Sequence, residues 1–300
     1  MTGPAIETHG LTKAFGELVA VNQLDLAVER GEVFGFLGPN GAGKTTTIRM
    51  LLDFLRPTSG TLSVLGDDVR NPSLRRRIGY LPAELKIDRR YSGNDVISYF
   101  GGIRGGVDRQ FASALAERFG LDLSRPSGRL STGNRRKIGI LQAFMHRPEL
   151  LILDEPTSGL DPLLQDEFQD LVRETAARGT TVFLCSHMLP EVEALAGRVA
   201  IIRAGRLATV ATMEQLRARA RHHIIFRVEG PFEPAAFAAL PGVVESRAEA
   251  HDLVVIVEGS VDPVLKAAAK LTVTRIETPG DDLAEIFRAF YESDEHGAAG

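Results

Sequence analysis

The sequence predicts an α/β core with a mainly parallel sheet, carrying an antiparallel β layer and a helical insertion, and then a small α+β domain. Three observations predict this fold class: compact apolar runs alternate with amphipathic segments, one run is continuously apolar, and the alternation stops near residue 221. The chain has 300 residues, which exceeds a typical single domain. We therefore expect two domains, residues 1–221 and residues 222–300.

The first expected element is an antiparallel β layer between Ile6 and Glu29, where apolar residues partly alternate with others. A compact apolar strand, VFGFLG, follows from Val33 and leads into the glycine-rich stretch GPNGAGKTT. The next segment, TIRMLLDFL, has its apolar residues at helical spacing. This helix is expected to stop at Arg56, because Pro57 disfavours helical geometry in the residue before it.

A mostly helical insertion is expected over residues 85–147, broken by glycine pairs that begin at Gly101 and Gly105. After it, LLILDEP has the continuous apolar character of a central parallel strand that is covered on both faces. Asp161 provides the N-cap of a helix that ends at Gly179, and TVFLCSH is the strand that follows.

The second domain is expected to have the order βαββαβ, which resembles a ferredoxin-like unit, with one helix added at its end. Its elements are a strand over HIIFRVE, a helix near Pro234 to Leu240, strands over GVVESR and DLVVIVEG, a helix over VDPVLKAAAK, a strand over LTVTRIE and a last helix over DDLAEIFRAFY. The last helix has one apolar face, which we expect to pack onto the small sheet.

The composition limits the classes of partner. The net charge is −4 and the isoelectric point is near 6.0, so no electrostatic argument favours nucleic acid as the main partner. A single cysteine, Cys185, cannot form an internal disulfide, and the N-terminus lacks the features of a secretory signal. The longest stretch without Asp, Glu, Lys or Arg, Gly179 to Pro190, is shorter than the roughly 20 residues of a spanning helix. We expect a cytoplasmic protein, which would serve a membrane only as a docked peripheral subunit.

A glycine-rich segment carries the strongest chemical signal. It has the pattern of a phosphate-binding loop: glycine, four residues, glycine, lysine and a hydroxyl residue, placed between a strand and a helix. Backbone N–H groups of such a loop face phosphates at a helix N-terminus, where orphan donors and the helix dipole favour anions. Lys44 is expected to reach the β- and γ-phosphates of ATP, and Thr45 to hold Mg²⁺. The expected nucleotide contacts in this segment are Gly38, Pro39, Asn40, Gly41, Ala42, Gly43, Lys44, Thr45 and Thr46.

Two acidic residues at the end of LLILDEP complete this chemistry. Asp154 ends an apolar strand, so its carboxylate is expected at the carboxyl edge of the sheet, where open α/β sheets bind ligands. Glu155 comes next and points in a different direction. Asp154 is therefore a candidate ligand of Mg²⁺, and Glu155 is a candidate general base that faces the γ-phosphate.

Three further motifs narrow the family. The sequence from Leu130 to Asn134 is LSTGN, Ser158 to Asp161 is SGLD, and His187 follows the strand TVFLCS. In this order, and with the phosphate loop, they resemble the signature motif, D-loop and switch histidine of ABC ATPases. The chain is accordingly identified as a member of that family, with a P-loop ATPase core. The motifs and the small second domain look most like the bacterial drug- and antibiotic-export subgroup.

The resemblance implies a subunit that binds and hydrolyses ATP and powers transport, in the direction of export, through a separate transmembrane permease. Two such ATPase domains, expected to be a homodimer, sandwich two ATP molecules, and each chain's signature motif completes the other's site. Ser131, Gly133 and Asn134 are then expected at the partner's ATP, with Asp161 in the D-loop. His187 is implied to be a second catalytic residue, which contacts the γ-phosphate and orients the attacking water.

The same resemblance places Phe15 at the aromatic position that stacks on adenine, and it assigns Val21 to nucleotide binding. The family usually has a tyrosine at the first position. Phenylalanine keeps the π-face of tyrosine and lacks only the hydroxyl, so stacking is expected to survive.

Two motifs depart from the family pattern. Ala83 stands where the family has its Q-loop glutamine. An alanine cannot ligate Mg²⁺ or relay contact with a membrane subunit, so either Glu84 takes that role or the coupling is modified. Thr132 and Asn134 replace a glycine and a glutamine of the signature motif, which changes its phosphate contacts but not its position.

Two other classes of function fit a phosphate-loop ATPase. One is a non-transport ABC ATPase that acts as a mechanical switch on the ribosome or DNA, but the second cassette or long coiled-coil insertion of such proteins is missing here. The other is a regulatory or resistance protein with vestigial hydrolysis, which the intact set of Lys44, Asp154, Glu155 and His187 disfavours. The transported substrate cannot be inferred, because the membrane subunit selects it.

Overall fold

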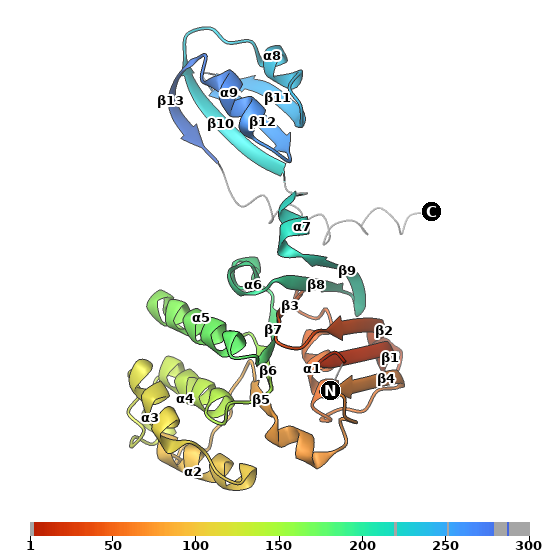
Figure 1. The fold of residues 1–300 in the computed structure, drawn as a ribbon, viewed down its shortest axis with the longest axis vertical. Coiled ribbons are helices and arrows are strands. Elements are labelled where there is room, and N and C mark those ends of the chain that lie inside the picture. The colour runs from red at the N-terminus through yellow and green to blue at the C-terminus, as the bar shows by residue number, and fades with distance from the viewer. Residues whose placement is uncertain (1–2, 219–220, 251, 279–286, 288–300) are drawn as a thin grey trace. The chain divides into compact units, whose positions relative to one another are not determined.

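The computed structural model describes residues 3–218, 221–250, 252–278 and 287, and it divides into two compact units, Met1–Val210 and Ala211–Gly300 (Figure 1). The division between the units falls after Val210, earlier in the chain than the boundary that we expected near residue 221. The difference arises because the segment with the short helix α7 (Met213–Ala218) groups with the second unit by its contacts. No helix among the described residues has the length and apolar character needed to cross a bilayer.

The first unit begins with the expected antiparallel layer. Strands β1 (Ile6–Phe15) and β2 (Leu18–Val28) pair antiparallel, and β4 (Ser59–Val64) adds to the other side of β1, which gives the order β2-β1-β4. The third strand was not expected. It reaches this layer from beyond the phosphate-loop helix, and its short, polar sequence gives no strong strand signal.

A six-stranded sheet forms the centre of this unit, in the order β5-β6-β7-β3-β8-β9. The pairs β5–β6, β6–β7, β3–β7 and β3–β8 are all parallel, which confirms the predicted parallel core. Every residue of β6 and β7 is buried, as the continuous apolar runs predicted. The strands are β3 (Val33–Leu37), β5 (Ile78–Leu81), β6 (Leu150–Asp154), β7 (Thr181–Ser186), β8 (Arg198–Arg203) and β9 (Arg206–Thr212).

Helices lie on both sides of this sheet. In Figure 1, α2 to α5 lie to the left of the parallel strands, while α1 and the antiparallel layer lie to the right. The predicted helical insertion is thus confirmed as α2, α3 and α4. The helices are α1 (Lys44–Leu51), α2 (Gly93–Arg104), α3 (Arg109–Arg118), α4 (Thr132–Phe144), α5 (Pro162–Ala177) and α6 (Leu189–Leu195), with 3₁₀ turns η1 (Pro72–Arg76) and η2 (Ser127–Arg129).

Two helix ends differ from expectation. Helix α1 ends at Leu51 rather than at Arg56, because Asp53 adopts a left-handed conformation with φ of 56° that stops the helix before the proline acts. Helix α2 continues through the glycine pair at Gly101 and ends at Gly105, whose φ of 87° forms a left-handed cap.

One apolar core joins the antiparallel layer, α1 and the parallel sheet. Its fully buried side chains include Phe34 and Phe36 of β3, Phe183 of β7, and Ile48 and Met50 of α1. The rings of Phe36 and Phe183 are 5.3 Å apart, so neighbouring strands interlock through aromatic contacts. This packing fixes the start of α1 against the ends of β3 and β6.

The second unit holds a four-stranded sheet in the order β11-β12-β10-β13, in which every neighbouring pair is antiparallel. Two short helices contribute to its apolar core, including Phe237 and Val264. The predicted last helix lies mostly outside the described residues. The elements are β10 (Arg221–Glu229), α8 (Pro234–Ala238), β11 (Val243–Glu249), β12 (Asp252–Glu258), α9 (Asp262–Ala268) and β13 (Thr272–Glu277).

Candidate functional site

The predicted phosphate loop connects β3 to α1, and its glycines are needed because the backbone passes close to other chain segments. A side chain at Gly38 would place its Cβ 2.3 Å from the carbonyl oxygen of Ile202. At Gly43 the φ is 106°, and a Cβ would lie 2.5 Å from the carbonyl oxygen of Ala20. The loop is therefore held in one conformation by β2 and β8, ahead of any ligand.

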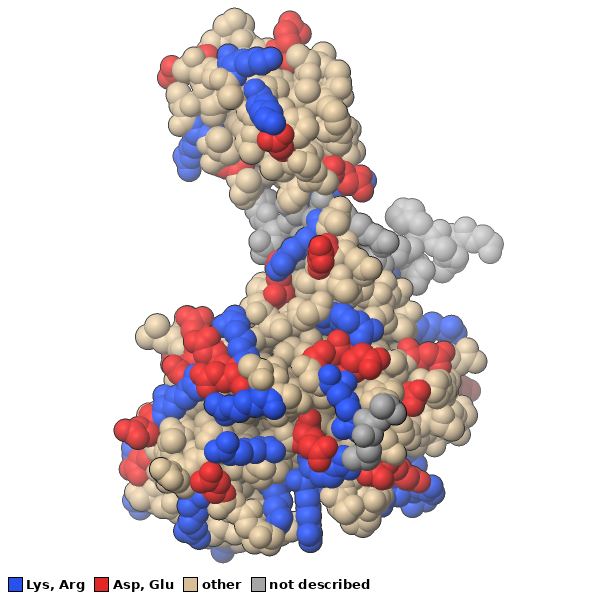
Figure 2. All heavy atoms as spheres, viewed as in Figure 1, with Lys and Arg blue, Asp and Glu red and all other residues tan. Residues whose placement is uncertain are grey.

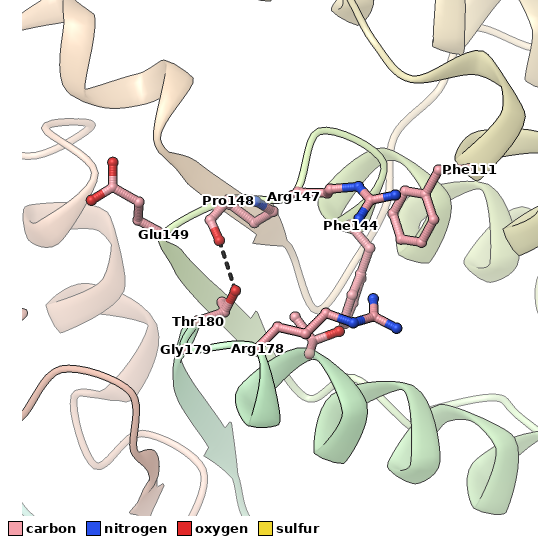
Figure 3. A pocket seen from close by; sticks show the side chains of 9 residues that line it. Phe111, Phe144, Arg147, Pro148, Glu149, Arg178, Gly179 and Thr180 are labelled. Atoms are coloured by element: carbon pink, nitrogen blue, oxygen red, sulfur yellow. Dashed lines mark hydrogen bonds between the residues drawn. The ribbon is translucent and has the colours of Figure 1, made fainter.

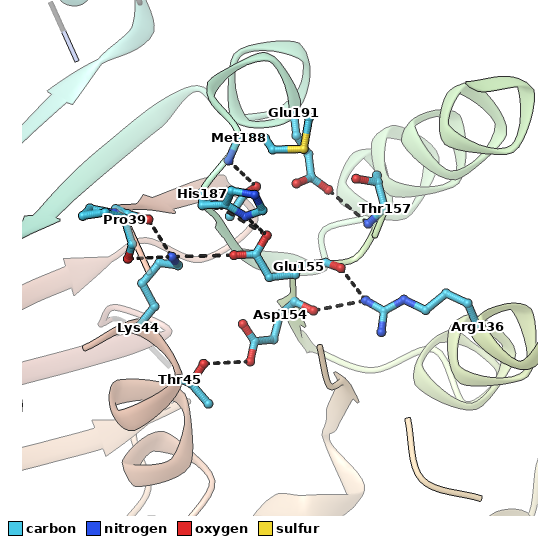
Figure 4. Close-up of polar contacts among 12 residues, drawn as sticks. Pro39, Lys44, Thr45, Arg136, Asp154, Glu155, Thr157, His187, Met188 and Glu191 are labelled. Carbon is cyan, nitrogen blue, oxygen red and sulfur yellow. Dashed lines mark hydrogen bonds and ion pairs between the residues drawn. The ribbon is translucent and has the colours of Figure 1, made fainter. Parts of the chain in front are cut away.

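Lys44 lies buried at the centre of this loop (Figure 4). Its ammonium group donates to the carbonyl oxygens of Gly38 at 2.6 Å and Pro39 at 3.2 Å, and it lies 3.6 Å from Oε1 of Glu155. A buried cation at the N-terminus of a helix, with partners that are mostly neutral carbonyls, is a strong site for an anionic ligand.

Thr45 and Asp154 form the candidate metal position. The hydroxyl of Thr45 donates to Oδ2 of Asp154 at 3.3 Å, whereas Oδ1 is buried and has no partner among the described residues. Burial, and then the negative charge of Glu155, raise the pKa of Asp154. No group of three or more potential His, Cys, Asp or Glu ligands occurs in the described part of the chain. A hydroxyl and a carboxylate are hard oxygen ligands, so the pair fits Mg²⁺, which takes most of its other ligands from phosphates and water.

Glu155 stands just past the end of β6, with its backbone in the left-handed region at φ of 48°. Its N–H donates to the carbonyl oxygen of Cys185 at 2.9 Å, and its Oε2 lies 2.7 Å from Nδ1 of His187. The structure thus brings together the two predicted catalytic side chains, from the carboxyl ends of neighbouring strands β6 and β7 (Figure 4). A left-handed conformation is uncommon for a residue with a side chain, and it is often found at functional sites.

Arg136 is a residue of this site that sequence reasoning missed. It is buried in α4, and its guanidinium donates to five main-chain carbonyl oxygens at the edge of the sheet. A signal was available, because Arg136 shares the buried face of α4 with Ile140, Ala143 and Phe144 at helical spacing. A charged residue on an apolar stripe indicates a buried polar function rather than a solvated face.

Glu191 is a second buried group that was not predicted. Its Oε1 accepts from the N–H of Thr157 at 3.3 Å, and burial raises its pKa. The hydroxyl of Ser186 also contacts it and accepts from the N–H of Met188 at 2.9 Å. These contacts join the loop after β6 to the loop after β7 that carries His187.

The signature segment lies apart from this cluster. Ser131 caps α4, its hydroxyl accepting from the N–H of Asn134 at 3.2 Å. Gly133 lies beside the D-loop, since a Cβ there would be 3.3 Å from the carbonyl oxygen of Gly159. Asp161 caps α5 as predicted, accepting from Leu164 at 3.0 Å. Within the described residues, no hydrogen bond joins the signature segment to the phosphate loop of its own chain.

Comparison with known proteins identifies this arrangement. The model of the ABC transporter family matches residues 21–158. A daunorubicin resistance ATP-binding protein of Streptomyces coeruleorubidus is 40% identical over 251 residues, which cover 80% of this chain and 79% of that protein. The bacitracin transport ATP-binding protein of Bacillus licheniformis is 36% identical over 228 residues, 74% of each chain. A solved ATP-binding subunit of an ABC transporter is similar with a TM-score of 0.67 and 26% identity, covering 71% of this chain and 92% of that one.

The chain belongs to the ABC transporter family. It is an ATP-binding ATPase subunit of a transporter of this family. A dimeric ATP-binding cassette bound to ADP and Pi, with a TM-score of 0.62 and 19% identity, shares the fold.

The remaining predicted contacts of this ABC ATPase differ in exposure. Phe15, at the end of β1, has 49% of its surface exposed, with the Lys13 ammonium 5.1 Å from its ring centre. Val21 is instead fully buried beneath Gly43 of the loop, so it shapes the loop from below. In the loop itself, Asn40 and Gly41 are exposed, Ala42 is buried and Thr46 is half-buried.

The segment after β5 presents its backbone to the site. Ala83 is exposed, but its carbonyl oxygen accepts from Arg136 at 2.9 Å. Glu84 has 80% of its side chain exposed, and it pairs with Lys86 at 3.5 Å rather than with any residue of the site.

A separate cavity of about 300 Å³ lies at the amino ends of β6 and β7, the opposite edge of the sheet from the phosphate loop (Figure 3). The Arg147 guanidinium lies 4.3 Å from the centre of the Phe111 ring, and Thr180 donates to the carbonyl oxygen of Pro148 at 2.9 Å. None of the predicted site residues lines this cavity.

Proposed function

We propose that this ABC ATPase powers the export of a drug or antibiotic through a separate transmembrane permease. The observation that carries the proposal is the cluster of Lys44, Thr45, Asp154, Glu155 and His187 at one edge of the parallel sheet. The names of the relatives, which concern daunorubicin resistance and bacitracin transport, support the substrate class and the direction.

In this proposal the loop from Gly38 to Thr46 holds the phosphates of ATP, with Lys44 at the β- and γ-phosphates and Phe15 stacked on adenine. Thr45 and Asp154 hold Mg²⁺, which would neutralise phosphate charge. The orphaned Oδ1 of Asp154 supports this role. Glu155 acts as general base toward the attacking water, and its contact with His187 supports a joint arrangement.

Two copies of the chain are proposed to form the working ATPase. Ser131, Gly133 and Asn134 would contact the ATP of the partner, near Asp161 in the D-loop. The exposure of Ser131 and its position at the N-terminus of α4 support this, because such a terminus favours anions.

The permease is proposed to dock in a groove of about 580 Å³ between the central sheet and the helical insertion. Its lining exposes large apolar side chains, with Phe54 62% and Ile103 53% exposed, and includes three arginines but no acidic residue. Exposed apolar surface of this kind marks interaction sites. Docking there would hold the chain as a peripheral subunit on the cytoplasmic, inner face of the cell membrane. The lining residues are Leu52, Phe54, Pro72, Arg75, Arg76, Ile78, Tyr80, Pro82, Phe100, Ile103, Arg104 and Gln142.

Nucleic acid is not part of this proposal. The net charge is −4, and acidic and basic side chains lie next to one another over much of the face in Figure 2.

The second unit is proposed to be a ferredoxin-like domain. Its strand order β11-β12-β10-β13 with antiparallel neighbours, and helices after β10 and β12, support that assignment.

Substitution of the proposed base tests the function. General-base catalysis contributes roughly 10²–10⁴-fold, so Glu155→Gln should bind ATP normally and hydrolyse it at least about a hundredfold more slowly than the wild type. With ATP, this variant should also elute as a dimer in gel filtration. Glu117→Gln, an exposed position on α3, is the matched control and should leave both properties unchanged.

Near-normal hydrolysis by Glu155→Gln would contradict the proposed role of Glu155 as the general base. If that variant is inactive but stays monomeric with ATP, the chain pairs with a different ATPase rather than with itself.

A further inference from the structure

Arg136 connects three segments that are far apart in the sequence: the end of β5, the end of β6 and the first turns of α4. We propose that Arg136 is a positioning residue for hydrolysis, which holds Glu155 in the backbone conformation that aims its carboxylate at the site. The inference rests on the proposed role of Glu155 as the base, and it assigns no contact between Arg136 and the nucleotide.

The hydrogen bonds of Arg136 use every donor of its guanidinium. Nε donates to the carbonyl oxygen of Pro156 at 3.1 Å, and Nη2 donates to those of Asp154 at 3.1 Å and Glu155 at 2.5 Å. Nη1 donates to the carbonyl oxygens of Pro82 and Ala83, the latter at 2.9 Å. Arginine has five N–H groups in a rigid fork, and here each has an acceptor. A lysine has three donors and cannot reproduce this pattern.

Three of the five acceptors are consecutive carbonyl groups that surround the proposed base. The residue between the first and the last of them, Glu155, has the left-handed φ of 48°. This conformation costs free energy for a residue with a side chain, so it persists only where neighbouring contacts enforce it. Arg136 holds the carbonyl groups on both sides of Glu155, while Cys185 accepts from its N–H at 2.9 Å.

The carboxylate of Glu155 reaches its partners as a result of that backbone conformation. It lies 3.6 Å from Nζ of Lys44 and 2.7 Å from Nδ1 of His187. A general base must stand within hydrogen-bond reach of the proton that it takes, and a displacement of about 1 Å can cost about a hundredfold in rate. Loss of the Arg136 contacts would therefore slow hydrolysis without removing any group that binds ATP.

The two other acceptors extend the network to the segment after β5. Arg136 contacts Pro82 and Ala83 through main-chain carbonyls, so this connection needs no particular side chain at either position. Arg136 thereby joins this exposed segment and α4, with its signature turn, to the peptide groups of Glu155. The network supplies a link between these segments although Ala83 replaces the usual glutamine.

The test compares Arg136→Gln and Arg136→Lys with the wild-type full-length chain, by steady-state hydrolysis and by binding of a fluorescent ATP analogue. Arg136→Gln should lower kcat about a hundredfold and change ATP affinity less than about threefold. The kcat of Arg136→Lys should lie between those of Arg136→Gln and the wild type. Arg118→Gln is the control, because Arg118 is a half-buried arginine of α3 that pairs with Glu167 and Glu174 outside the site. It should keep the wild-type kcat.

The double variant Glu155→Gln/Arg136→Gln separates positioning from general stability. If Arg136 acts through Glu155, the double variant should hydrolyse ATP no more slowly than Glu155→Gln alone, within about threefold. A further hundredfold loss in the double variant would overturn the inference. A wild-type kcat in Arg136→Gln would also overturn the inference. If Arg136→Gln does not fold, a wild-type kcat in Arg136→Lys would overturn it instead. Normal hydrolysis by Glu155→Gln would overturn the proposed base as well, whereas an active Arg136 variant beside an inactive Glu155→Gln overturns only the positioning role.

Discussion

Two arginines of the ATPase unit, the buried Arg136 and the half-buried Arg104, differ in how their hydrogen bonds are satisfied. Burial lowers the pKa of both guanidinium groups, Arg136 in α4 and Arg104 at the end of α2. Arg136 has a carbonyl acceptor for each of its donors. In contrast, Nη1 of Arg104 is buried without a hydrogen-bond partner among the described residues, and so is Nδ1 of nearby His146. The donors of Arg136 are thus all satisfied within one chain, whereas Nη1 of Arg104 lacks an acceptor, which a partner could supply.

The locations of the two clusters agree with this difference. Arg136 lies at the carboxyl edge of the sheet beside Glu155, where fixed geometry favours catalysis. Arg104 lines the apolar groove in which we propose that the permease docks, and its guanidinium lies 5.5 Å from the ring centre of Phe100. A carboxylate on the docked segment would complete its hydrogen bonds.

Removal of each guanidinium gives the largest expected contrast. Arg136→Met removes all five hydrogen bonds of the guanidinium to main-chain carbonyl groups, so it should lower the free energy of unfolding by at least about 3 kcal/mol. Arg104→Met removes a half-buried cation whose Nη1 lacks an acceptor, and it should change the free energy of unfolding by no more than about 1 kcal/mol. Urea denaturation of both variants, with unchanged m-values, measures this. Equal destabilisation by the two substitutions would show that the clusters do not differ in the way that their hydrogen bonds indicate.

The pH dependence of stability tests the second cluster by itself. Burial, and then the charge of Arg104, lower the pKa of His146 from 6.5 to about 4. Between these pH values the unfolded chain binds a proton that the folded chain does not, so the folded state loses stability as the pH falls from 6.5 toward 4. The loss should be about 2 to 3 kcal/mol for this one group.

The matched variant for this effect is His146→Gln, which keeps a side chain able to donate to the carbonyl oxygen of Ile78. Its urea midpoint should depend less on pH across this range than the wild-type midpoint does. Identical pH profiles for the two proteins would mean that His146 is not kept neutral by its surroundings.

The sequence predicted the parts of the site that depend on local pattern. The phosphate loop, with Lys44 and Thr45, follows from glycine positions between a strand and a helix, and Asp154 follows from the end of an apolar run. The end of α1 was predicted wrongly, at Arg56 instead of Leu51, because the left-handed conformation of Asp53 leaves no strong composition signal. The role of Arg136 was missed because its acceptors lie 18 to 54 positions away, and no local pattern shows which carbonyl groups converge on a side chain.

The smallest expected effect comes from the position that departs most visibly from the family pattern. Ala83 joins the Arg136 cluster through its carbonyl oxygen at 2.9 Å, and its side chain is exposed. Ala83→Ser keeps that carbonyl group, so the rate of ATP hydrolysis by the isolated chain should stay within about twofold of the wild-type rate. The activation free energy should therefore change by much less than the roughly 1.4 kcal/mol that corresponds to a tenfold change in rate. A loss of tenfold or more, measured beside Arg136→Gln, would mean that the side chain at this position and not only the backbone acts in hydrolysis. A small effect would localise the function of this segment to its main chain, which Arg136 holds against the peptide groups of Glu155.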